Sequence, residues 1–184
     1  MSNTQDLVFN EARIVFRNFA GIESKSNRAG ARNFSVVIPN KEAAVALYND
    51  GWNVAVKPQT PEDREAIKMG KNLIEKIAIL EANGSADDAL YHLKCNVNMD
   101  SRKAPKIYVV AGQKKKPILQ TKDTVAQIDV LDILYCDIVI HPYLWDGPMG
   151  SGMTAYLDTM YVVVNADPFA DKYAIDDDDN YYNN

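Results

Sequence analysis

The chain has 184 residues, of which 47% are hydrophobic and 24% charged, a composition typical of a soluble globular protein. Its length suits one domain with an elaboration, or two small domains. No apolar run reaches the roughly 18 residues needed to span a bilayer. The N-terminus has no basic segment followed by an apolar one, so neither a membrane span nor a signal peptide is predicted, and we expect a cytoplasmic location.

The formal net charge of −5 lies entirely at the end of the chain. Residues 165–184 hold six acids against one base, whereas residues 1–164 hold 19 of each. Such a segment cannot bury enough apolar surface to offset the entropy of ordering it. We therefore expect one domain over residues 1–164 and a disordered, acidic tail over residues 165–184, which either solubilises the chain or docks a partner. The docking candidates are Asp176, Asp177, Asp178, Asp179, Tyr181 and Tyr182.

The first third of the chain alternates β-rich and helical segments. Asn40 is a suitable helix N-cap and Gly51 a suitable stop. Strands are expected over 7–19, 32–39 and 52–57, a basic loop over 21–31, and a short helix over 41–50. The first two strands and their loop are expected to form a hairpin.

One long helix is predicted over residues 60–84. Thr60 can cap its N-terminus and Pro61 suits its first position. Apolar residues recur at helical spacing along one side, which we expect to pack on the body of the domain. They are Ala66, Met69, Leu73, Ile77 and Leu80.

The β pattern returns at Leu90, with Tyr91, Leu93, Cys95 and Val97 on one face and His92, Lys94, Asn96 and Asn98 on the other. A strand over 106–111, a short helix over 124–131 and a long hairpin of 134–145 and 153–164, joined by a loop over 146–152, are expected to follow. Short strands with two or three helices favour a mostly antiparallel β barrel with helical additions.

Basic residues gather in two stretches that also hold aromatic residues. Residues 91–122 contain eight bases against one acid, and residues 13–32 contain five against one. Cations neutralise phosphates and aromatic rings stack on bases, so this combination suits single-stranded nucleic acid. The alternative interpretation is that the aromatics fill the core and the lysines are solvated. Adjacent strand residues face opposite sides, so if Arg17 faces a ligand, Phe16 faces the core.

Other chemistry finds less support in the sequence. The pairs His92/Cys95 and Cys136/His141 have offsets of three and five, which place each pair on opposite faces of a strand, so we expect no zinc site and buried, unpaired cysteines. The glycine-rich run GPMGSG lacks the ending of a phosphate-binding loop. Three carboxylates that a nuclease would need are present, but nothing fixes their geometry: Asp129, Asp132 and Asp137. We expect no cofactor and no catalysis.

Four motifs together resemble a known family. FRNF at 16–19, NRAGARNFSVVIP at 27–39, DGWNV at 50–54 and AYLDTMYVVV at 155–164 are similar to motifs of the single-stranded-DNA-binding proteins of many tailed bacteriophages. The resemblance covers about residues 7–57 and 91–175. It implies an OB-fold, a small five-stranded barrel that binds single strands across one face. The chain departs from that pattern over residues 59–90, where a long helix is inserted. Its acidic tail resembles the tails of bacterial single-strand-binding proteins but ends NYYNN instead of in an apolar Pro-Phe tip.

With this resemblance, we expect an OB-fold-like protein that coats and protects single-stranded DNA in phage replication or recombination, tolerates any base sequence, and recruits replication or recombination proteins through its tail. The alternatives are an assembly module without nucleic-acid binding and, with less support, a metal-dependent nuclease. The phosphate-binding candidates are Arg17, Lys25, Arg28, Arg32, Lys94, Lys103 and Lys106. The stacking candidates are Phe34, Trp52, Tyr91 and Tyr108.

Overall fold

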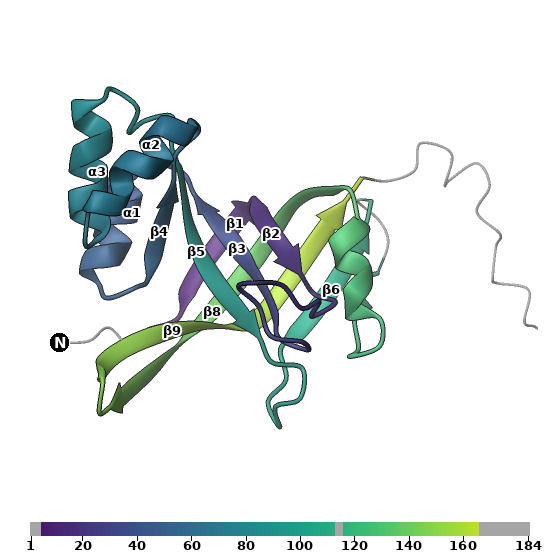
Figure 1. Ribbon diagram of the computed structural model, residues 1–184. Helices are drawn as coiled ribbons and strands as arrows, with labels where there is room; N and C mark the ends of the chain where they lie inside the picture. The colour runs from purple at the N-terminus through teal and green to yellow at the C-terminus, as the bar shows by residue number, and fades with distance from the viewer. Residues whose placement is uncertain (1–4, 113–115, 166–184) are drawn as a thin grey trace, which may run out of the picture.

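The computed structural model describes residues 5–112 and 116–165 (Figure 1). Lys114, Lys115 and all of the predicted tail beyond Asn165 lie outside the described residues. The strands are β1 (Leu7–Ala12), β2 (Ile14–Asn18), β3 (Arg32–Ile38), β4 (Val54–Lys57), β5 (Leu90–Val97), β6 (Lys106–Ala111), β7 (Ile118–Leu119), β8 (Ile133–Gly147) and β9 (Gly150–Val164). The helices are α1 (Lys41–Asn49), α2 (Pro61–Ala66), α3 (Leu73–Ala82) and the 3₁₀ turns η1 (Ile67–Met69) and η2 (Val125–Val130).

The strands form one curved sheet in the order β1-β8-β9-β5-β3-β2, with β4 beside β5 and β6 beside β9. The two end strands, β1 and β2, are consecutive in the chain and are separated by Arg13 alone. The prediction of a mostly β domain with helical additions is confirmed, but the strands do not form the expected antiparallel barrel. The sheet is mixed, because β9 runs parallel to β5 and β6, and its hydrogen bonds do not close it into a barrel.

Two irregularities bend the N-terminal segment so that β1 pairs with β8 and β2 pairs with β3. The pairing register shifts between Phe9 and Ala12 and again between Val15 and Asn18. Inside each shift lies a residue with a positive φ, 50° at Glu11 and 52° at Phe16. Positive φ is uncommon for residues other than glycine, and a bulge of this kind bends a strand and redirects its side chains.

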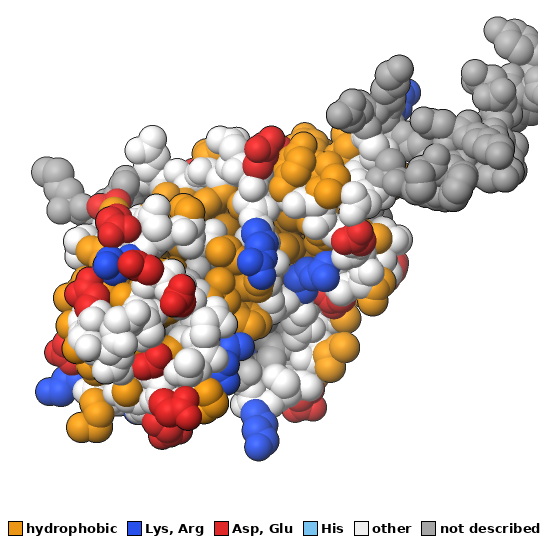
Figure 2. Space-filling model, turned by 90° about the horizontal axis from the view of Figure 1, so that it is seen from above, with side chains coloured by type: hydrophobic (Ala, Val, Ile, Leu, Met, Phe, Trp, Pro, Cys, Tyr) orange, Lys and Arg blue, Asp and Glu red, His pale blue; other side chains and the backbone are white. Residues whose placement is uncertain are grey.

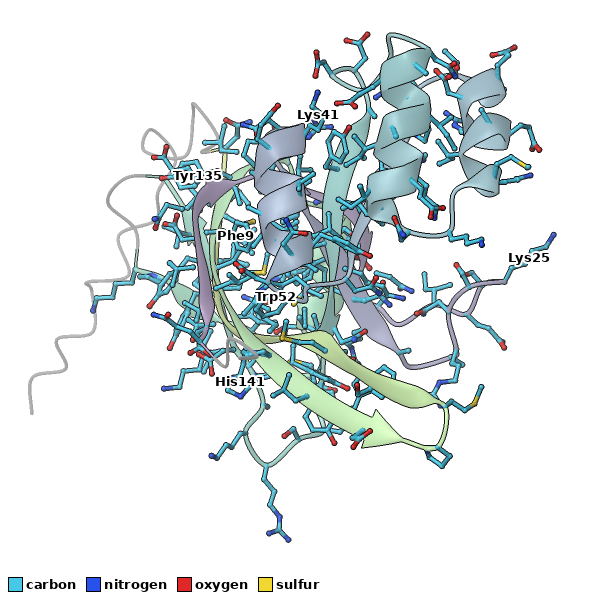
Figure 3. The ribbon with its side chains drawn as sticks, turned by 90° about the vertical axis from the view of Figure 1, so that its left-hand side faces the viewer. Phe9, Lys25, Lys41, Trp52, Tyr135 and His141 are labelled. Carbon is cyan, nitrogen blue, oxygen red and sulfur yellow. The ribbon has the colours of Figure 1, made fainter. Side chains whose placement is uncertain are left out.

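The core consists mostly of buried side chains from the strands, and side chains from α1, α3 and η2 complete it. Strict alternation along β5 buries Tyr91, Leu93, Cys95 and Val97, as the sequence predicts. Phe19 stacks on Phe34 with ring centroids 5.4 Å apart. Trp52 precedes β4 and is enclosed beneath α1, where Figure 3 shows it inside the fold.

The helices α1, α2 and α3 gather at one end of β3, β4 and β5 (Figure 1). The prediction of a single helix over 60–84 is wrong, because α2 and η1 are separated from α3 by a break. Gly70 adopts an extended backbone (φ −81°, ψ 131°), and Asn72 starts a new helix by accepting a hydrogen bond from the Glu75 N–H. Leu73 and Ile77 of α3 pack into the core as expected, whereas Met69 is exposed because it lies before the break.

The final hairpin is longer than the sequence predicts. β8 and β9 remain paired as far as Gly147 and Gly150, so much of the expected loop over 146–152 is strand. The helix expected over 124–131 is the 3₁₀ turn η2, which buries Val125 and Ile128. Among the described residues, no helix is long and apolar enough to cross a membrane.

Candidate nucleic-acid interface

Three of the four predicted stacking residues are buried. Phe34 is 0% exposed, Trp52 1% and Tyr91 2%. Phe34 and Tyr91 alternate onto the inner face of β3 and β5, and the Tyr91 hydroxyl donates a hydrogen bond to the Ala86 carbonyl. A ring enclosed on both sides has no face on which a base can stack. The stacking prediction is therefore wrong for these three residues.

The outward side chains of the same strands form a different aromatic cluster, centred on Phe16 of β2. Phe16 is 46% exposed, and its ring meets the edge of His92 with centroids 5.1 Å apart. The Lys57 ammonium lies 4.7 Å from the centroid of the Phe16 ring. Beneath them, Ser35 Oγ and His92 Nδ1 lie within hydrogen-bond distance at 3.1 Å. The cluster therefore presents to the solvent one half-exposed ring with a cation placed over it.

Strand parity predicts that Phe16 faces the core if Arg17 faces a ligand; the structure shows neither, because the bulge at Phe16 interrupts the alternation. With φ at 52°, Phe16 does not continue the alternation, so its ring lies over Ser35 and His92 on the outer face. Arg17 instead donates two hydrogen bonds, to the carbonyls of Ile128 and Leu131, at 2.9 Å each. The bulge thus supplies the sheet with an exposed ring at a position where alternation predicts a buried one.

The electrostatics of this cluster favour anion binding. Burial, and then the positive charge of Lys57, lower the pKa of His92 below its ordinary value, so the free protein holds its imidazole neutral near pH 7. Lys57 and Lys94 are exposed on the same face. An incoming phosphate therefore meets two ammonium groups beside an uncharged aromatic surface.

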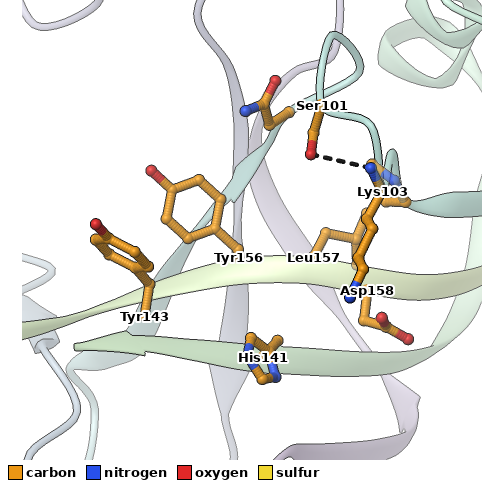
Figure 4. A pocket seen from close by; sticks show the side chains of 9 residues that line it. Ser101, Lys103, His141, Tyr143, Tyr156, Leu157 and Asp158 are labelled. Carbon is orange, nitrogen blue, oxygen red and sulfur yellow. Dashed lines mark hydrogen bonds between the residues drawn. The ribbon is translucent and has the colours of Figure 1, made fainter.

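A second aromatic pair lies where β8 and β9 approach the end of β5 (Figure 4). Tyr143 and Tyr156 meet edge to face with centroids 6.0 Å apart. They line a hollow of about 460 Å³ whose other walls include Lys103 and the exposed His141. Figure 4 shows both rings projecting from the side of the hairpin on which Ser101 and Lys103 also lie. This pair is not predicted from the sequence, because residues distant in the chain build the hollow.

The two clusters belong to one surface. Tyr156 is paired in register with Asn96, and His92 precedes Asn96 by four residues on β5, a separation of about 13 Å. Lys94 lies between them and is exposed. We call this surface the outer face; it consists of Phe16, Lys57, His92, Lys94, Asn96, Lys103, Tyr143 and Tyr156.

The other predicted phosphate ligands differ in the exposure and hydrogen bonding of their side chains. Arg32, like Arg17, is half-buried, and its Nε donates to the Phe19 carbonyl at 2.9 Å. Both arginines therefore serve to hold the backbone. Lys25 and Arg28 are exposed in the loop between β2 and β3, which projects from the body near the label of Lys25 in Figure 3.

Tyr108 and Lys106 lie on a separate part of the sheet. Tyr108 stacks on Tyr161 of β9 with centroids 4.8 Å apart and planes 16° apart. The two residues are paired in register between the parallel strands β6 and β9. The stack therefore stabilises that pairing, and it lies outside the outer face defined above.

The three carboxylates that a nuclease would need are each bonded to a different part of the protein. Asp129 accepts hydrogen bonds from the backbone N–H groups of Phe19 and Ala20, Asp137 from that of Glu11, and Asp132 from the Asn165 amide. No group of three or more His, Cys, Asp or Glu side chains in the described part of the chain is placed to hold a metal.

Both thiols point into the core. Cys95 and Cys136 are buried and unpaired, and burial raises the pKa of Cys136 to about 12 and raises that of Cys95 as well. Cys95 lies on the inner face of β5 while His92 lies on its outer face, as the sequence predicts. Neither thiol is available as a thiolate nucleophile or ligand.

Charge divides the molecule into two parts. Figure 2 shows acidic side chains gathered over the helical region, at the left of that view, while Lys and Arg side chains lie among hydrophobic ones toward the middle. Lys41 of α1 is surrounded by three carboxylates, those of Glu81 (3.0 Å), Asp87 (3.5 Å) and Glu42 (3.9 Å). A polyanion is repelled by this end of the molecule and is attracted by the outer face.

Comparison with solved structures finds distant likenesses. The single-stranded DNA-binding protein of bacteriophage Enc34, in a C-terminally truncated form, matches with a TM-score of 0.46 and 9% identity over 89% of this chain and 88% of that one. Its complex with ssDNA matches with a TM-score of 0.43 and 10% identity, over 89% of both chains. The gp2.5 single-stranded DNA-binding protein of bacteriophage T7 matches with a TM-score of 0.38 and 12% identity, over 98% of both chains.

The family itself is identified from the sequence. No curated protein sequence is significantly similar to the chain. A family model described as "Putative phage ssDNA-binding domain" matches residues 1–72 and 64–180. Since these matches together span nearly the whole chain, it belongs to this family of phage ssDNA-binding domains.

Proposed function

We propose that this chain coats single-stranded DNA in phage replication or recombination by laying the strand across the outer face. The proposal rests on one observation. The cluster of Phe16, His92 and Lys57 and the Tyr143–Tyr156 hollow lie on the same face of the sheet, toward opposite ends of β5. Rings with exposed faces and free ammonium groups alternate across this surface. That arrangement binds bases by stacking and the backbone by charge.

Each part of the face has a distinct role in this proposal. The ring of Phe16 and those of Tyr143 and Tyr156 stack on bases, for roughly 1–3 kcal/mol per base. Lys94 and Lys103 neutralise phosphates between the stacking positions. Every base has a π-face, so binding tolerates any base sequence. From the loop between β2 and β3, Lys25 and Arg28 reach phosphates at the edge of the face.

The chain acts without catalysis in this proposal, and its place of action is the host cytoplasm. Asp129, Asp132 and Asp137 each accept hydrogen bonds from the protein, at separate positions, which supports a structural role for all three. We further propose that residues 1–164 form the binding domain and that residues 165–184 are an acidic arm for replication or recombination proteins. The six acids in that segment support this division.

The test is fluorescence anisotropy of labelled oligo-dT with the full chain over a series of salt concentrations. The affinity should fall steeply as salt rises, because neutralised phosphates release counterions. Oligo-dA and oligo-dC of the same length should bind within a few-fold of oligo-dT. Absence of binding at low salt, for the full chain and for a form ending at Asn165, would contradict the proposal and favour an assembly module.

The outer face is tested separately from DNA binding as such. Phe16→Ala combined with Tyr156→Ala should weaken binding much more than Tyr108→Ala, which removes a ring of the stack on β6. Equal losses from both variants would show that the strand follows another surface. Circular dichroism spectra of the variants confirm that each retains the fold.

A further inference from the structure

A shallow apolar groove runs between α1 and α3, at the acidic end of the molecule. Its floor includes Val45, Ile77 and Ala78, and Ile74 at its side is 42% exposed. The groove has a volume of about 440 Å³. Hydrophobic side chains left exposed around a concavity mark a contact surface more often than isolated ones do.

The rim of the groove is negatively charged. Lys41 is its one cation among the lining residues, and it is held by Glu42, Glu81 and the neighbouring Asp87. Three carboxylates against one ammonium leave an excess of negative charge around the apolar floor. The groove therefore suits an occupant that carries an exposed apolar side chain with cations close to it in the chain.

The loop between β2 and β3 combines an exposed apolar side chain with exposed cations. Ile22 in it is 68% exposed; Lys25 lies in the turn between Ser24 and Asn27, Arg28 follows that turn, and both are exposed, against the single acid Glu23. The neighbouring loop over 98–105 adds the exposed bases Arg102 and Lys103 at the same end of the sheet, beside Asp100, which is paired with Lys122.

The loop is ordered before any contact forms. The Asn18 side chain both donates to the Ile22 carbonyl and accepts from the Ile22 N–H. Asn27 Nδ2 donates to the carbonyls of Ile22, Arg28 and Ala31, and the Gly30 N–H donates to the Gly21 carbonyl. A loop held in this way loses little conformational entropy when it docks.

Loop and groove lie at opposite ends of the molecule. The loop precedes Arg32, which pairs with Val97 at one end of the β3–β5 ladder, and α1 follows Ile38, which pairs with Tyr91 at the other. The ladder between them is about 20 Å long. Figure 3 shows Lys25 on a projecting loop and Lys41 at the start of α1, well apart. The loop of one molecule therefore cannot occupy its own groove.

We propose that the Ile22 loop of one copy docks in the α1–α3 groove of a second copy, so that copies associate head to tail. Ile22 covers Ile74 and the groove floor, while Lys25 and Arg28 pair with Glu42 and Glu81 of the neighbour. Because the loop and the groove are different patches, a row of copies has a free loop at one end and a free groove at the other. Unless the row closes into a ring, further copies can add to its ends. In such a row, Lys25 and Arg28 contact phosphates only in the copy whose loop is free.

The consequence for DNA rests on the proposed function, but the contact itself does not. On a long single strand, a row of copies would bind cooperatively. On an oligonucleotide that accommodates one copy, removing the groove contact would leave the affinity unchanged. This separates failure of the association from failure of DNA binding.

The experiment is sedimentation velocity of the full chain without DNA, over a range of protein concentrations at low and high salt. The average mass should rise with concentration at low salt, and less so at high salt. Ile22→Asp and Ile74→Asp should each remain monomeric. Ile118→Asp is the matched control, since Ile118 is exposed on β7 and belongs to neither patch, and it should behave as the parent chain.

Mixing the two defective variants gives the sharpest result. The Ile22→Asp variant retains an intact groove, and the Ile74→Asp variant retains an intact loop. One copy of each can therefore form a single loop-to-groove contact, so an equimolar mixture should form complexes of two copies and none larger. If Ile74→Asp fails to fold, Glu42→Lys replaces it, because Glu42 is exposed on α1. A monomeric parent chain at low salt, association that survives in both single variants, or a mixture that stays monomeric would each overturn the proposal.

Discussion

The two faces of the β3–β5 pair hold similar residues but differ in what those residues do. The inner face carries Phe34 and Tyr91, which are enclosed in the core. The outer face carries His92 and Lys94, with Phe16 of β2 laid beside them. An aromatic residue stabilises the fold on the inner face and is available to a ligand on the outer face. The number of aromatics in a basic region therefore does not identify the binding surface; the face on which each ring lies does.

The largest expected effect is on the inner face. Phe34→Ala removes a fully buried ring that stacks on Phe19, so it should lower the free energy of unfolding by about 3–5 kcal/mol. Urea denaturation measures this loss. At a temperature where the variant remains folded, its affinity for oligo-dT should be that of the parent chain. A large loss of affinity in folded Phe34→Ala would assign the ring to the ligand after all.

Phe16→Ala should have the opposite profile. Its ring is half exposed, so the free energy of unfolding should change little, while the affinity for oligo-dT should fall by roughly 1–3 kcal/mol, the contribution of one stacked base. Anisotropy titrations and urea denaturation of the same preparation measure both quantities. Phe16→Tyr keeps a ring at this position and serves as the control. A destabilised variant with unchanged affinity would contradict the division between the faces.

Lys94→Ala tests the charge between the two aromatic clusters. The loss of one phosphate contact should reduce the slope of log affinity against log salt by about 0.7. Lys68→Ala is the matched control, because Lys68 lies in the helical region and pairs with Glu65 at 2.5 Å. Identical slopes for Lys94→Ala and the parent chain would remove Lys94 from the path of the strand.

Removing the acidic end of the chain should have a smaller, salt-dependent effect on the affinity for oligo-dT. Residues 176–179 are four consecutive aspartates, which we expect to compete with phosphate for the cations of the outer face. Deleting residues 176–184 should therefore tighten binding to oligo-dT, most visibly at low salt. A chain with asparagine at these four positions controls for length and should match the deletion. Unchanged affinity at low salt would leave the segment a role in docking partners or in solubility.

The smallest expected effect concerns pH. Burial and Lys57 lower the pKa of His92 in the folded chain, so the folded state resists protonation that the unfolded state accepts. The stability that depends on neutral His92 is present above about pH 6.5 and is lost as the pH falls below that value. Urea midpoints at about pH 7.5 and 5.5 should differ more for the parent chain than for His92→Gln.

The carboxylates affect stability in a lower pH range than His92 does. Hydrogen bonds from Asn83 to Asp63 and from Lys122 to Asp100 lower the pKa of each acid, so their contribution to stability is lost as the pH falls below about 4. Equal pH dependence in the parent chain and in His92→Gln would show that the imidazole does not contribute in the higher range.

Local patterns in the sequence were sufficient to predict much of this fold. Alternation along 90–97 predicted the buried and exposed residues of β5, and Asn40 and Thr60 cap α1 and α2 as expected. The motifs at 16–19, 27–39, 50–54 and 155–164 identified the family that the family model confirms. These features depend on side-chain periodicity, capping chemistry and composition, which short stretches of chain carry in full.

Tertiary structure decided where the candidate site lies. The bulge at Phe16 lies within the pairing of β2 with β3, and it reverses the face expected from alternation. Tyr143 and Tyr156 meet Lys103 only when the β8–β9 hairpin lies against the end of β5. Sequence alone thus determined the family and most elements, whereas pairing between distant strands determined which rings and cations share a surface. Burial and register depend on those distant partners, and no local pattern records them.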